Sequence, residues 1–528
     1  MPKSPTELNR ICDFPLWGRK TFKLYSMDTS SVLIIGGGLG GLFTGALLAK
    51  EGVRVTIIEK NANCGGGLQS FRRFGEVFDT GMHVFGGMRD GGNIRRICDY
   101  LGISDKIHLR DVDSNCSDVV HIAEDGMSYR IAEGKEGFID SLSSYFPDQR
   151  DNLRRYVDAL YSIVDELDLF YLRPSGSSLS GHSDEFLMSA DSFIAKYITD
   201  TRLRSVLAYL SLLYAGRRGV TPAYIHALIS VLHINGPSRF EGGSQLFADT
   251  LKDFIISHNG EVVLSDAVET IHTQGRLITG VETRKGRTFT AERYISDIHP
   301  CTLFSLFEDP SAFPKAYRKR LEGLPNSCSA FSLNIVLKPG TFRYVNHSDY
   351  YISTYDSVWN FGDPAPDWPQ GFLYMTPPEI VQGEFARKMV VVAPMSWSFV
   401  EKWEDSRTGR RPAEYGEWKR RCADKLIDSL EKFLPGLRDC IEEYDCSSPL
   451  TIRDWYGVKE GSMYGFSKDC NNITASHLPI ATKIPNLLLT GQNCNVHGFC
   501  GVTLVAVSTA EAVLGTNHIV NEITAFEK

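Results

Sequence analysis

The chain has 528 residues, of which 42% are hydrophobic and 23% are charged. This length and composition predict a globular protein with a large core, divided into roughly two to four domain-sized units. The formal net charge of −8 argues against broad electrostatic binding to nucleic acid, because neutralising phosphates requires a concentrated basic face.

Residues 1–26 differ from the rest of the chain, because basic and aromatic residues outnumber acidic ones there. Two interpretations remain open. The segment is a surface-lying membrane anchor, since such a composition suits an anionic interface, or it is an extension without function and Met27 is the true start. The apolar positions show no sustained helical period, which favours the second interpretation.

Residues 31–49 carry no charge and are almost long enough to span a bilayer. Six glycines lie among them, and clustered glycine weakens a helix and favours a turn between a buried strand and a buried helix. We therefore expect no transmembrane segment here. Residues 32–35 predict a parallel strand, residues 39–47 a helix and residues 53–58 a second strand, which together form a βαβ unit.

The rest of the chain alternates between helical and strand-rich blocks. Residues from about 140 to 235 show helical periodicity. Ser244 is then a plausible N-cap of a helix, which leads into three short strands over 261–264, 277–283 and 288–295. Strands and helices mix over residues 306–450. A strand over 486–489, a loop over 491–501 and a helix over 502–514 close the pattern.

Twelve cysteines are spread from Cys12 to Cys500 without any C-x-x-C pair. The spacing fits neither a disulfide framework nor a zinc site, and no secretory signal precedes them. We therefore expect free thiols in a reducing cytoplasm and no metal centre.

A dinucleotide-binding fingerprint lies in the βαβ unit. Gly36-x-Gly38-x-x-Gly41 directly follows the first predicted strand and opens the predicted helix, which is the context that the motif requires. The first glycine permits the tight turn, the second lets the backbone approach a pyrophosphate, and the third lets helix pack on strand. Glu59 ends the second strand, where a carboxylate accepts hydrogen bonds from ribose hydroxyls and repels the extra phosphate of NADP.

Several further motifs carry a family resemblance. They are Gly65-Gly66-Gly67, Phe78-Asp79-Thr80-Gly81-Met82-His83, Gly242-Gly243-Ser244, Ser296-Asp297-Ile298-His299-Pro300 and Thr490-Gly491-Gln492. Through them the chain resembles the phytoene desaturase and retinol saturase family, within the wider FAD-dependent amine oxidase superfamily, and it is more similar to the saturase branch. The resemblance spans roughly residues 30–515, although its motifs concentrate in the nucleotide-binding parts.

The resemblance implies FAD as the cofactor. In such proteins the glycine doublet lies along the pyrophosphate and flavin, a valine backbone meets the adenine, and a closing helix points its N-terminus at the flavin ring. Backbone N–H groups at that N-terminus stabilise the negative charge of a reduced flavin, a role that Val502 and Thr503 would take here. The implied cofactor-binding residues are Gly36, Gly38, Leu39, Gly40, Gly41, Glu59, Lys60, Gly66, Gly67, Val268, Gly491, Gln492, Val502 and Thr503.

Two positions depart from the family pattern. Many members have Arg where Gly67 stands, so a contact to the pyrophosphate must come from Arg72, Arg73 or backbone N–H groups. Many members also have Asp where Gln492 stands, and an amide donates or accepts there but lacks the charge. Neither departure forbids FAD.

Three residues are candidates for the acid or base that exchanges a proton with the substrate. His83 follows the segment that the family places near the flavin, His497 lies in the closing loop, and Tyr464 lies in Gly461-Ser462-Met463-Tyr464-Gly465. For each of them a structural role in packing or hydrogen bonding is the alternative.

The predicted fold is α/β, with a discontinuous Rossmann-type FAD-binding domain and an inserted mixed α+β substrate domain. After an N-terminal extension over 1–26, the FAD-binding domain takes residues 27–110, 236–305 and 450–528. The substrate domain takes residues 111–235 and 306–449.

The resemblance implies an FAD-dependent oxidoreductase acting on CH–CH groups, which saturates or desaturates a C=C bond of a lipophilic isoprenoid or polyene substrate. Two alternatives remain open: a flavin amine or porphyrinogen oxidase, and a non-catalytic lipid- or prenyl-binding protein on the same scaffold. Gly36, Gly38, Gly41 and Glu59 argue against the carrier, which needs no pyrophosphate cradle.

No second glycine fingerprint occurs in strand–helix context, so we expect no separate NAD(P)H domain. NAD(P)H, a quinone and oxygen all remain open as electron partners. We expect a cytoplasmic location, and a peripheral membrane contact stays open because a lipophilic substrate arrives from a bilayer or a carrier.

Overall fold

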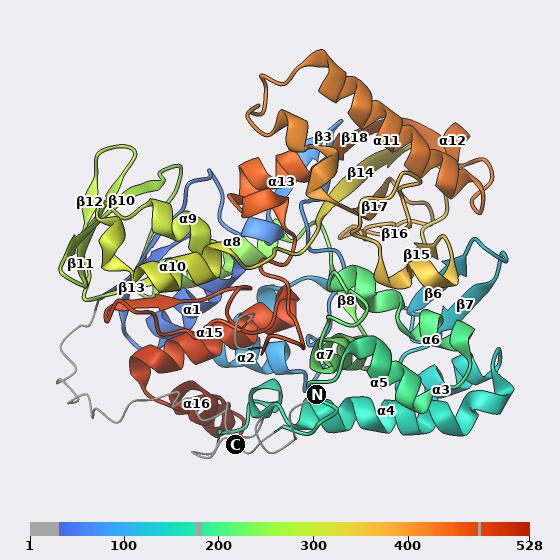
Figure 1. The fold of residues 1–528 in the computed structure, drawn as a ribbon, viewed down its shortest axis with the longest axis horizontal. Helices are drawn as coiled ribbons and strands as arrows, with labels where there is room; N and C mark the ends of the chain where they lie inside the picture. The colour runs from blue at the N-terminus through green and yellow to red at the C-terminus, as the bar shows by residue number, and fades with distance from the viewer. Residues whose placement is uncertain (1–30, 176–181, 474–476) are drawn as a thin grey trace, which may run out of the picture.

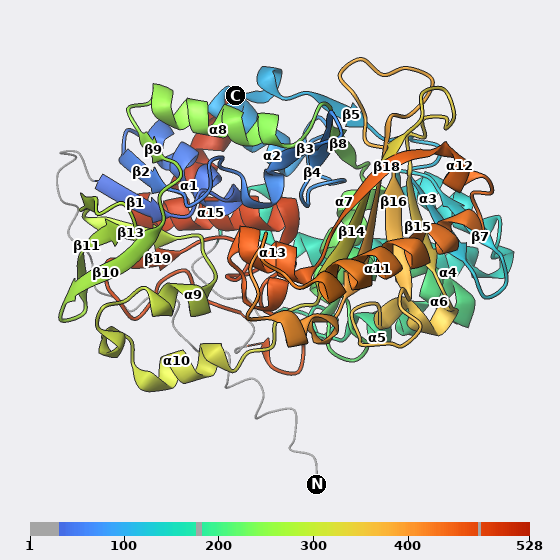
Figure 2. The same ribbon diagram turned by 90° about the horizontal axis from the view of Figure 1, so that it is seen from above.

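The computed structural model describes residues 31–175, 182–473 and 477–528. The expected extension over residues 1–26 lies outside this range. Two sheets dominate the described chain, and they lie side by side along the long axis of the molecule (Figures 1 and 2).

The first sheet is parallel and has the strand order β19-β13-β1-β2-β9. Its strands come from three stretches that are far apart in the chain: β1 (Ser31–Ile35) and β2 (Arg54–Ile58), then β9 (Glu261–Val263) and β13 (Arg293–Ser296), and finally β19 (Leu487–Leu489). The predicted α/β fold with a Rossmann-type sheet is confirmed.

Alternation along β1 separates the two layers that cover this sheet. Val32 and Ile34 pack on the side of α1 (Leu39–Lys50), and Leu33 and Ile35 pack on the other side, because successive strand residues point to opposite faces. α1 also contacts α8 (Gln245–Ser257) and α15 (Gly498–Leu514). The opposite layer contains the antiparallel strands β10 (Val268–Gln274), β11 (Leu277–Thr283) and β12 (Thr288–Phe289), with the helices α9 (Pro300–Ser305) and α10 (Lys315–Glu322).

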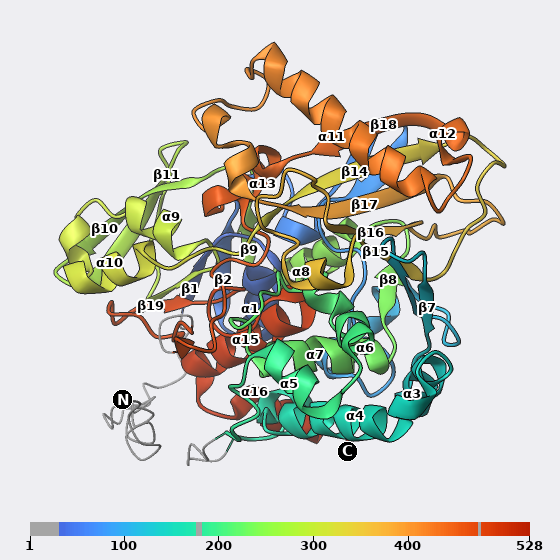
Figure 3. The ribbon, with the colours of Figure 1, turned by 45° about the vertical axis from the view of Figure 1, so that its right-hand side comes forward.

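The second sheet has seven strands in the order β18-β14-β17-β16-β15-β6-β7. Their bounds are β6 (Asp118–Ile122), β7 (Ser128–Ile131), β14 (Ser329–Leu337), β15 (Ser348–Ile352), β16 (Gly371–Met375), β17 (Lys388–Met395) and β18 (Ile441–Ser447). One face is covered by α11 (Ala413–Glu431). The other face is covered by the helical block (Figure 3), which consists of α3 (Lys135–Ser143), α4 (Arg150–Asp165), α5 (Ala190–Tyr197), α6 (Thr201–Leu207) and α7 (Ala223–Ile234).

Smaller elements complete the described fold. Two two-stranded pairs join β3 (Ser70–Arg73) to β4 (Glu76–Asp79) and β5 (Leu109–Asp111) to β8 (Ser238–Phe240). The remaining α-helices are α2 (Asn93–Leu101), α12 (Leu437–Cys440), α13 (Pro449–Tyr456) and α16 (His518–Phe526).

No single helix in the described part of the chain has the length and apolarity to cross a membrane, and only the bent pair of α15 and α16 passes that test, as a pair. The cysteines of the same residues are all free, and no group of three or more His, Cys, Asp or Glu there is placed to hold a metal ion.

Two local predictions are wrong. The strand expected over 288–295 is two strands in different sheets, because β12 pairs with β11 and β13 pairs with β1. The closing helix begins at Gly498 rather than at 501–502, since burial of Phe499 and Cys500 outweighs the weak helix propensity of glycine. Ser244 is the N-cap residue of α8, as predicted, although its hydroxyl donates to the Leu68 carbonyl rather than capping the helix.

The turn between β1 and α1 depends on glycine. Gly36 has φ +99°, a conformation that L side chains rarely adopt. A Cβ on Gly41 would lie 2.2 Å from the Gly36 carbonyl oxygen, so the helix packs directly against the turn. The turn therefore has no room for a side chain at this point.

Gly41→Ala is expected to lower the free energy of unfolding by about 1–3 kcal/mol, because the turn must shift to admit the methyl group. Gly416→Ala is the control: it lies inside α11, where the added Cβ meets only the Arg420 Nη1 at 3.9 Å, and it should stabilise the protein by about 0.5–1 kcal/mol. Urea unfolding measures both. A midpoint for Gly41→Ala equal to that of the wild type would contradict this account of the turn.

Candidate functional site

A cavity of about 520 Å³ lies where the two sheets meet. Its wall combines the β1–α1 turn with residues of α7, of β14, β16 and β17, and of the closing segment before α15. The cavity therefore connects the dinucleotide turn with the seven-stranded sheet and the helical block.

Most of the predicted cofactor-binding residues line this cavity. Two of them do not: Gly41 packs against the turn as described above, and the Thr503 side chain is fully buried and donates to the Phe499 carbonyl at 2.9 Å. The predicted residues that line it are Gly36, Gly38, Leu39, Gly40, Glu59, Lys60, Gly66, Gly67, Val268, Gly491, Gln492 and Val502.

Glu59 is held in place by backbone groups. One carboxylate oxygen accepts from the Gly37 N–H at 2.9 Å and the other accepts from the Asn61 N–H at 2.8 Å. The side chain is buried but lines the cavity, and a carboxylate has lone pairs beyond those two bonds. It is therefore fixed in position to accept hydrogen bonds from a ribose.

The roles predicted for Val502 and Thr503 require correction. Because α15 begins at Gly498, their N–H groups lie beyond the first four residues and bond inside the helix. The free N–H groups of α15 belong to the first turn, Gly498 to Gly501. Gly498 and Cys500 line the cavity, so this first turn is the part of α15 that meets a bound anion.

Asp297 is a site residue that the sequence interpretation did not select. It follows β13, and its carboxyl lies within 2.4–2.5 Å of the positions where a Cβ on Gly38, Gly40 or Gly491 would stand. Burial and the charge of Glu59 raise the pKa of Asp297 to about 7, although hydrogen bonds from the Gly41 and Gly38 N–H groups favour the charged form. Its place at the carboxyl end of a parallel strand was the available signal.

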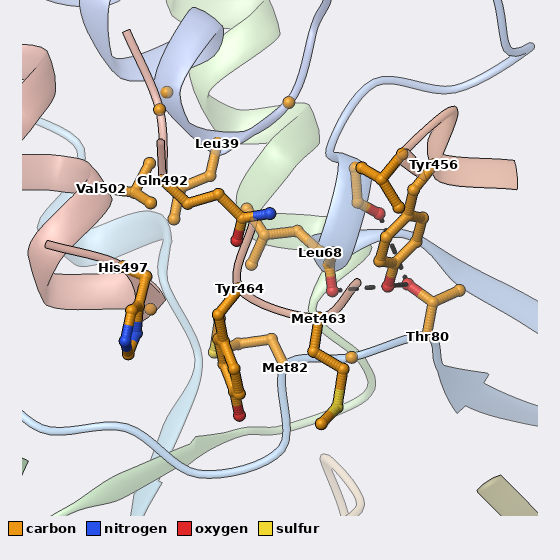
Figure 4. A pocket seen from close by; sticks show the side chains of 18 of the residues that line it. Leu39, Leu68, Thr80, Met82, Tyr456, Met463, Tyr464, Gln492, His497 and Val502 are labelled. Carbon is orange, nitrogen blue, oxygen red and sulfur yellow. Dashed lines mark hydrogen bonds between the residues drawn. The ribbon is translucent and has the colours of Figure 1, made fainter. Parts of the chain in front are cut away.

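Tyr456 and Thr80 form a hydrogen-bonded pair beside the glycine doublet Gly66-Gly67. The Tyr456 hydroxyl donates to the Thr80 Oγ1 at 3.1 Å, and the Thr80 hydroxyl lies 3.4 Å from the carbonyl oxygens of Gly66 and Gly67 (Figure 4). α13 and the segment after β4 thereby position the doublet.

His83, Tyr464 and His497, the three catalytic candidates, all line the cavity. The rings of Tyr464 and His497 pack together with centroids 4.7 Å apart (Figure 4). Burial lowers the pKa of His497 to about 3 and also lowers the pKa of His83. Burial raises the pKa of Tyr464. At neutral pH all three side chains are therefore uncharged.

The charged side chains of the described lining stand only at the dinucleotide end. They are Glu59, Lys60, Arg284 and Asp297. The opposite end is lined by apolar residues of the helical block and of the segment after β4, among them Val84, Phe85, Leu212, Leu213, Ile229 and Leu232, with His233 between them. The cavity therefore changes from charged to apolar along its length.

Comparison with known proteins supports this geometry. A family model described as an NAD(P)-binding Rossmann-like domain matches residues 34–101. An all-trans-retinol 13,14-reductase of Danio rerio is 25% identical over 92% of this chain and 86% of its own length. A chloroplastic prolycopene isomerase of an Oncidium hybrid is 24% identical over 93% of this chain and 82% of its own length. The predicted family resemblance is confirmed.

A solved structure supports the fold as well. Wild-type putrescine oxidase bound to putrescine has a TM-score of 0.60 and 14% identity, and the match covers 92% of this chain and 99% of that one. The amine oxidase type of fold predicted by the resemblance is thus present, with a Rossmann-like part.

Glu59 should discriminate between nucleotides. We expect cofactor-free protein to bind ADP-ribose at least about tenfold more tightly than its 2′-phosphate, because the buried carboxylate repels the extra phosphate. Glu59→Gln should reduce that ratio, and Glu76→Gln, outside the cavity lining, should leave it unchanged. Isothermal titration calorimetry measures the ratio; equal affinities in the wild type would refute the role of Glu59.

Proposed function

We propose that the protein is an FAD-dependent oxidoreductase that saturates or desaturates a carbon–carbon double bond of a lipophilic isoprenoid or polyene substrate. The observation that carries the proposal is the single cavity that joins a dinucleotide turn to an apolar end. The similarity to a retinol reductase and a prolycopene isomerase supports the same class of substrate.

The residues present fit FAD. No side chain stands at Gly38, Gly40 or Gly491, where a Cβ would meet the Asp297 carboxyl, so the backbone there is open to the approach of a pyrophosphate. Glu59 stands ready for the ribose, and Ala267 and Val268 offer an apolar surface for an adenine. Gly66, Gly67 and Gln492 line the cavity beyond the turn, toward the catalytic candidates.

FAD, when bound, supplies the hydride exchange that changes the bond order of the substrate. The protein's own residues orient the substrate, exclude water and donate or accept the proton. The first turn of α15 offers free N–H groups and the positive end of a helix dipole to developing negative charge. Tyr464 keeps its proton at neutral pH, because burial raises its pKa, so its hydroxyl offers a hydrogen-bond donor at the cavity wall.

Aromatic rings pack together at the apolar end of the cavity. The ring of Phe85 lies 4.5 Å from the rings of both Phe240 and Phe499, and Phe85 and Phe499 line the cavity. A dry apolar wall suits a hydrocarbon chain and strengthens the hydrogen bonds made inside it.

The distribution of charge disfavours the amine oxidase alternative. A bound amine cation is stabilised by a carboxylate, and the described lining places its carboxylates, Glu59 and Asp297, only at the dinucleotide end. Peroxide release with amines, and no change in any polyene, would favour that alternative instead.

We also propose a cytoplasmic location with a peripheral membrane contact. The free cysteines of the described residues are compatible with a reducing compartment. A lipophilic substrate, which must leave a bilayer or a carrier, supports the membrane contact.

The first experiment is to purify the chain from Met1 and from Met27, record the visible spectrum and identify the chromophore released by heat. We expect a flavin spectrum and free FAD. Lipid extracts incubated with the holoprotein should then show a mass change of two hydrogens. A colourless protein that takes up no FAD would overturn the oxidoreductase proposal and leave the lipid carrier.

FAD affinity should depend on pH through Asp297. The cofactor brings a diphosphate anion to the turn, so a charged Asp297 repels it and binding takes up a proton. Because the pKa of Asp297 is about 7, affinity should be full below pH 7 and fall above it, approaching about tenfold per pH unit.

Asp297→Asn should remove this dependence, since an amide carries no charge. Asp99→Asn, on the exposed side of α2, is the matched control and should keep the wild-type profile. Fluorescence titration of cofactor-free protein with FAD between pH 6 and 9 measures all three proteins. A flat wild-type profile, or a slope that survives in Asp297→Asn, would falsify the role of this carboxyl.

A further inference from the structure

His233 is the polar residue among the cavity-lining side chains of α7. Ile229, Leu232 and His233 line the cavity from this helix, at the spacing of three and four residues that places them on one helix face. Leu212 and Leu213, which precede the helix, extend the same apolar wall. A lone imidazole in such a wall requires a physical reason, because burying an unpaired polar group is costly.

The buried carboxylate of Asp118 forms a hydrogen bond with the imidazole of His233. The His233 Nδ1 lies 3.4 Å from the Asp118 Oδ2, and both side chains are almost completely buried. The same carboxylate oxygen accepts from the Tyr209 hydroxyl at 3.0 Å and from the Ser117 hydroxyl at 3.2 Å. Asp118 is thus itself fixed by two donors and fixes the ring of His233.

The carboxylate also sets which nitrogen of His233 carries the proton. A carboxylate accepts, so Nδ1 donates to Asp118, and in an imidazole with one proton Nε2 then carries the lone pair. No partner for Nε2 is present among the described residues. The Nε2 of His233 is therefore a hydrogen-bond acceptor in the cavity wall.

Another histidine on the same helix shows what a purely structural imidazole looks like. His226 is fully buried and uses both nitrogens: the Tyr156 hydroxyl lies 2.6 Å from Nε2 and the Tyr214 hydroxyl lies 2.9 Å from Nδ1. It does not line the cavity. His233 differs in both respects, with one nitrogen committed and the ring at the cavity wall.

We propose that His233, oriented by Asp118, accepts a hydrogen bond from a hydroxyl group of the substrate, so that the substrate is a lipophilic alcohol rather than a plain hydrocarbon. The inference rests on the proposed function and narrows its substrate class. A nitrogen that accepts a hydrogen bond favours an alcohol over an ether, which has no proton to donate, and a buried acceptor left unpaired penalises the ether.

The test compares all-trans-retinol with its methyl ether, which differs only at the oxygen. FAD-loaded holoprotein is equilibrated with each probe in dialysis, and bound probe is quantified by chromatography. The wild type should bind the alcohol at least about tenfold more tightly than the ether. His233→Leu should abolish that preference, and Asp118→Asn should weaken it because the ring is no longer held in one tautomer.

Ile229→Val, which trims a neighbouring lining residue, is the matched control: it should change the affinity for both probes alike. Retained FAD absorbance confirms that each variant is folded. Equal affinities in the wild type, binding of neither probe, or a preference that survives in His233→Leu would overturn the inference. The wild-type comparison stands even if a variant fails to fold.

The outcomes separate this inference from the proposed function. A protein that loads FAD and changes a polyene by two hydrogens, but binds alcohol and ether equally, keeps its proposed function and loses the role of His233. A colourless protein that takes up no FAD loses the proposed function, and the same dialysis carried out on that cofactor-free protein still reports on His233.

Discussion

The packing of the Asp297 carboxyl against three glycines is the contact on which the site depends. A Cβ on Gly38 or Gly40 would stand 2.5 Å from one of its oxygens, and a Cβ on Gly491 would stand 2.4 Å away. These glycines belong to the first and last stretches of the chain, and Asp297 belongs to the middle one. Three distant stretches therefore meet at one carboxyl, which excludes side chains from the turn and leaves room for a diphosphate.

The same contact would bring two negative charges together, the Asp297 carboxylate and the diphosphate of a bound cofactor. The Gly38 and Gly41 N–H groups that favour the charged Asp297 lie at the N-terminus of α1, where a phosphate also binds. Gly67 stands where many relatives in the family have an arginine, so no cation from that position offsets two anions. Neutralising the carboxyl resolves the conflict, and burial has already moved its pKa into the range where this requires little free energy.

The parts of the fold that local pattern specifies were predictable. The first βαβ unit, its glycine turn and Glu59 all combine short-range periodicity with a motif whose context is local. The division of 288–295 between two strands was not predictable in this way, because no glycine or proline marks the point where the chain crosses from one sheet to another. The start of α15 was missed for a related reason: tertiary burial, rather than propensity, determines where the helix begins.

The site residues likewise fall into two groups, those that local sequence predicts and those that depend on distant contacts. Residues near the turn were found because their spacing reports their role, whereas the role of His233 depends on Asp118, which lies in a strand of the other sheet. Nothing in the local sequence separates His233 from His226, although one lines the cavity and the other is a satisfied core residue.

The gradient of charge along the cavity connects these features to the chemistry. Charged side chains stand at one end of the cavity, where the proposed cofactor would bind, and burial keeps His83, Tyr464 and His497 neutral where the reaction would occur. A neutral donor and a dry wall suit proton exchange at carbon, since no fixed charge there competes with the developing charge of the transition state. Selectivity for a particular lipophile must then come from single hydrogen bonds such as the one offered by His233, because apolar walls alone discriminate weakly.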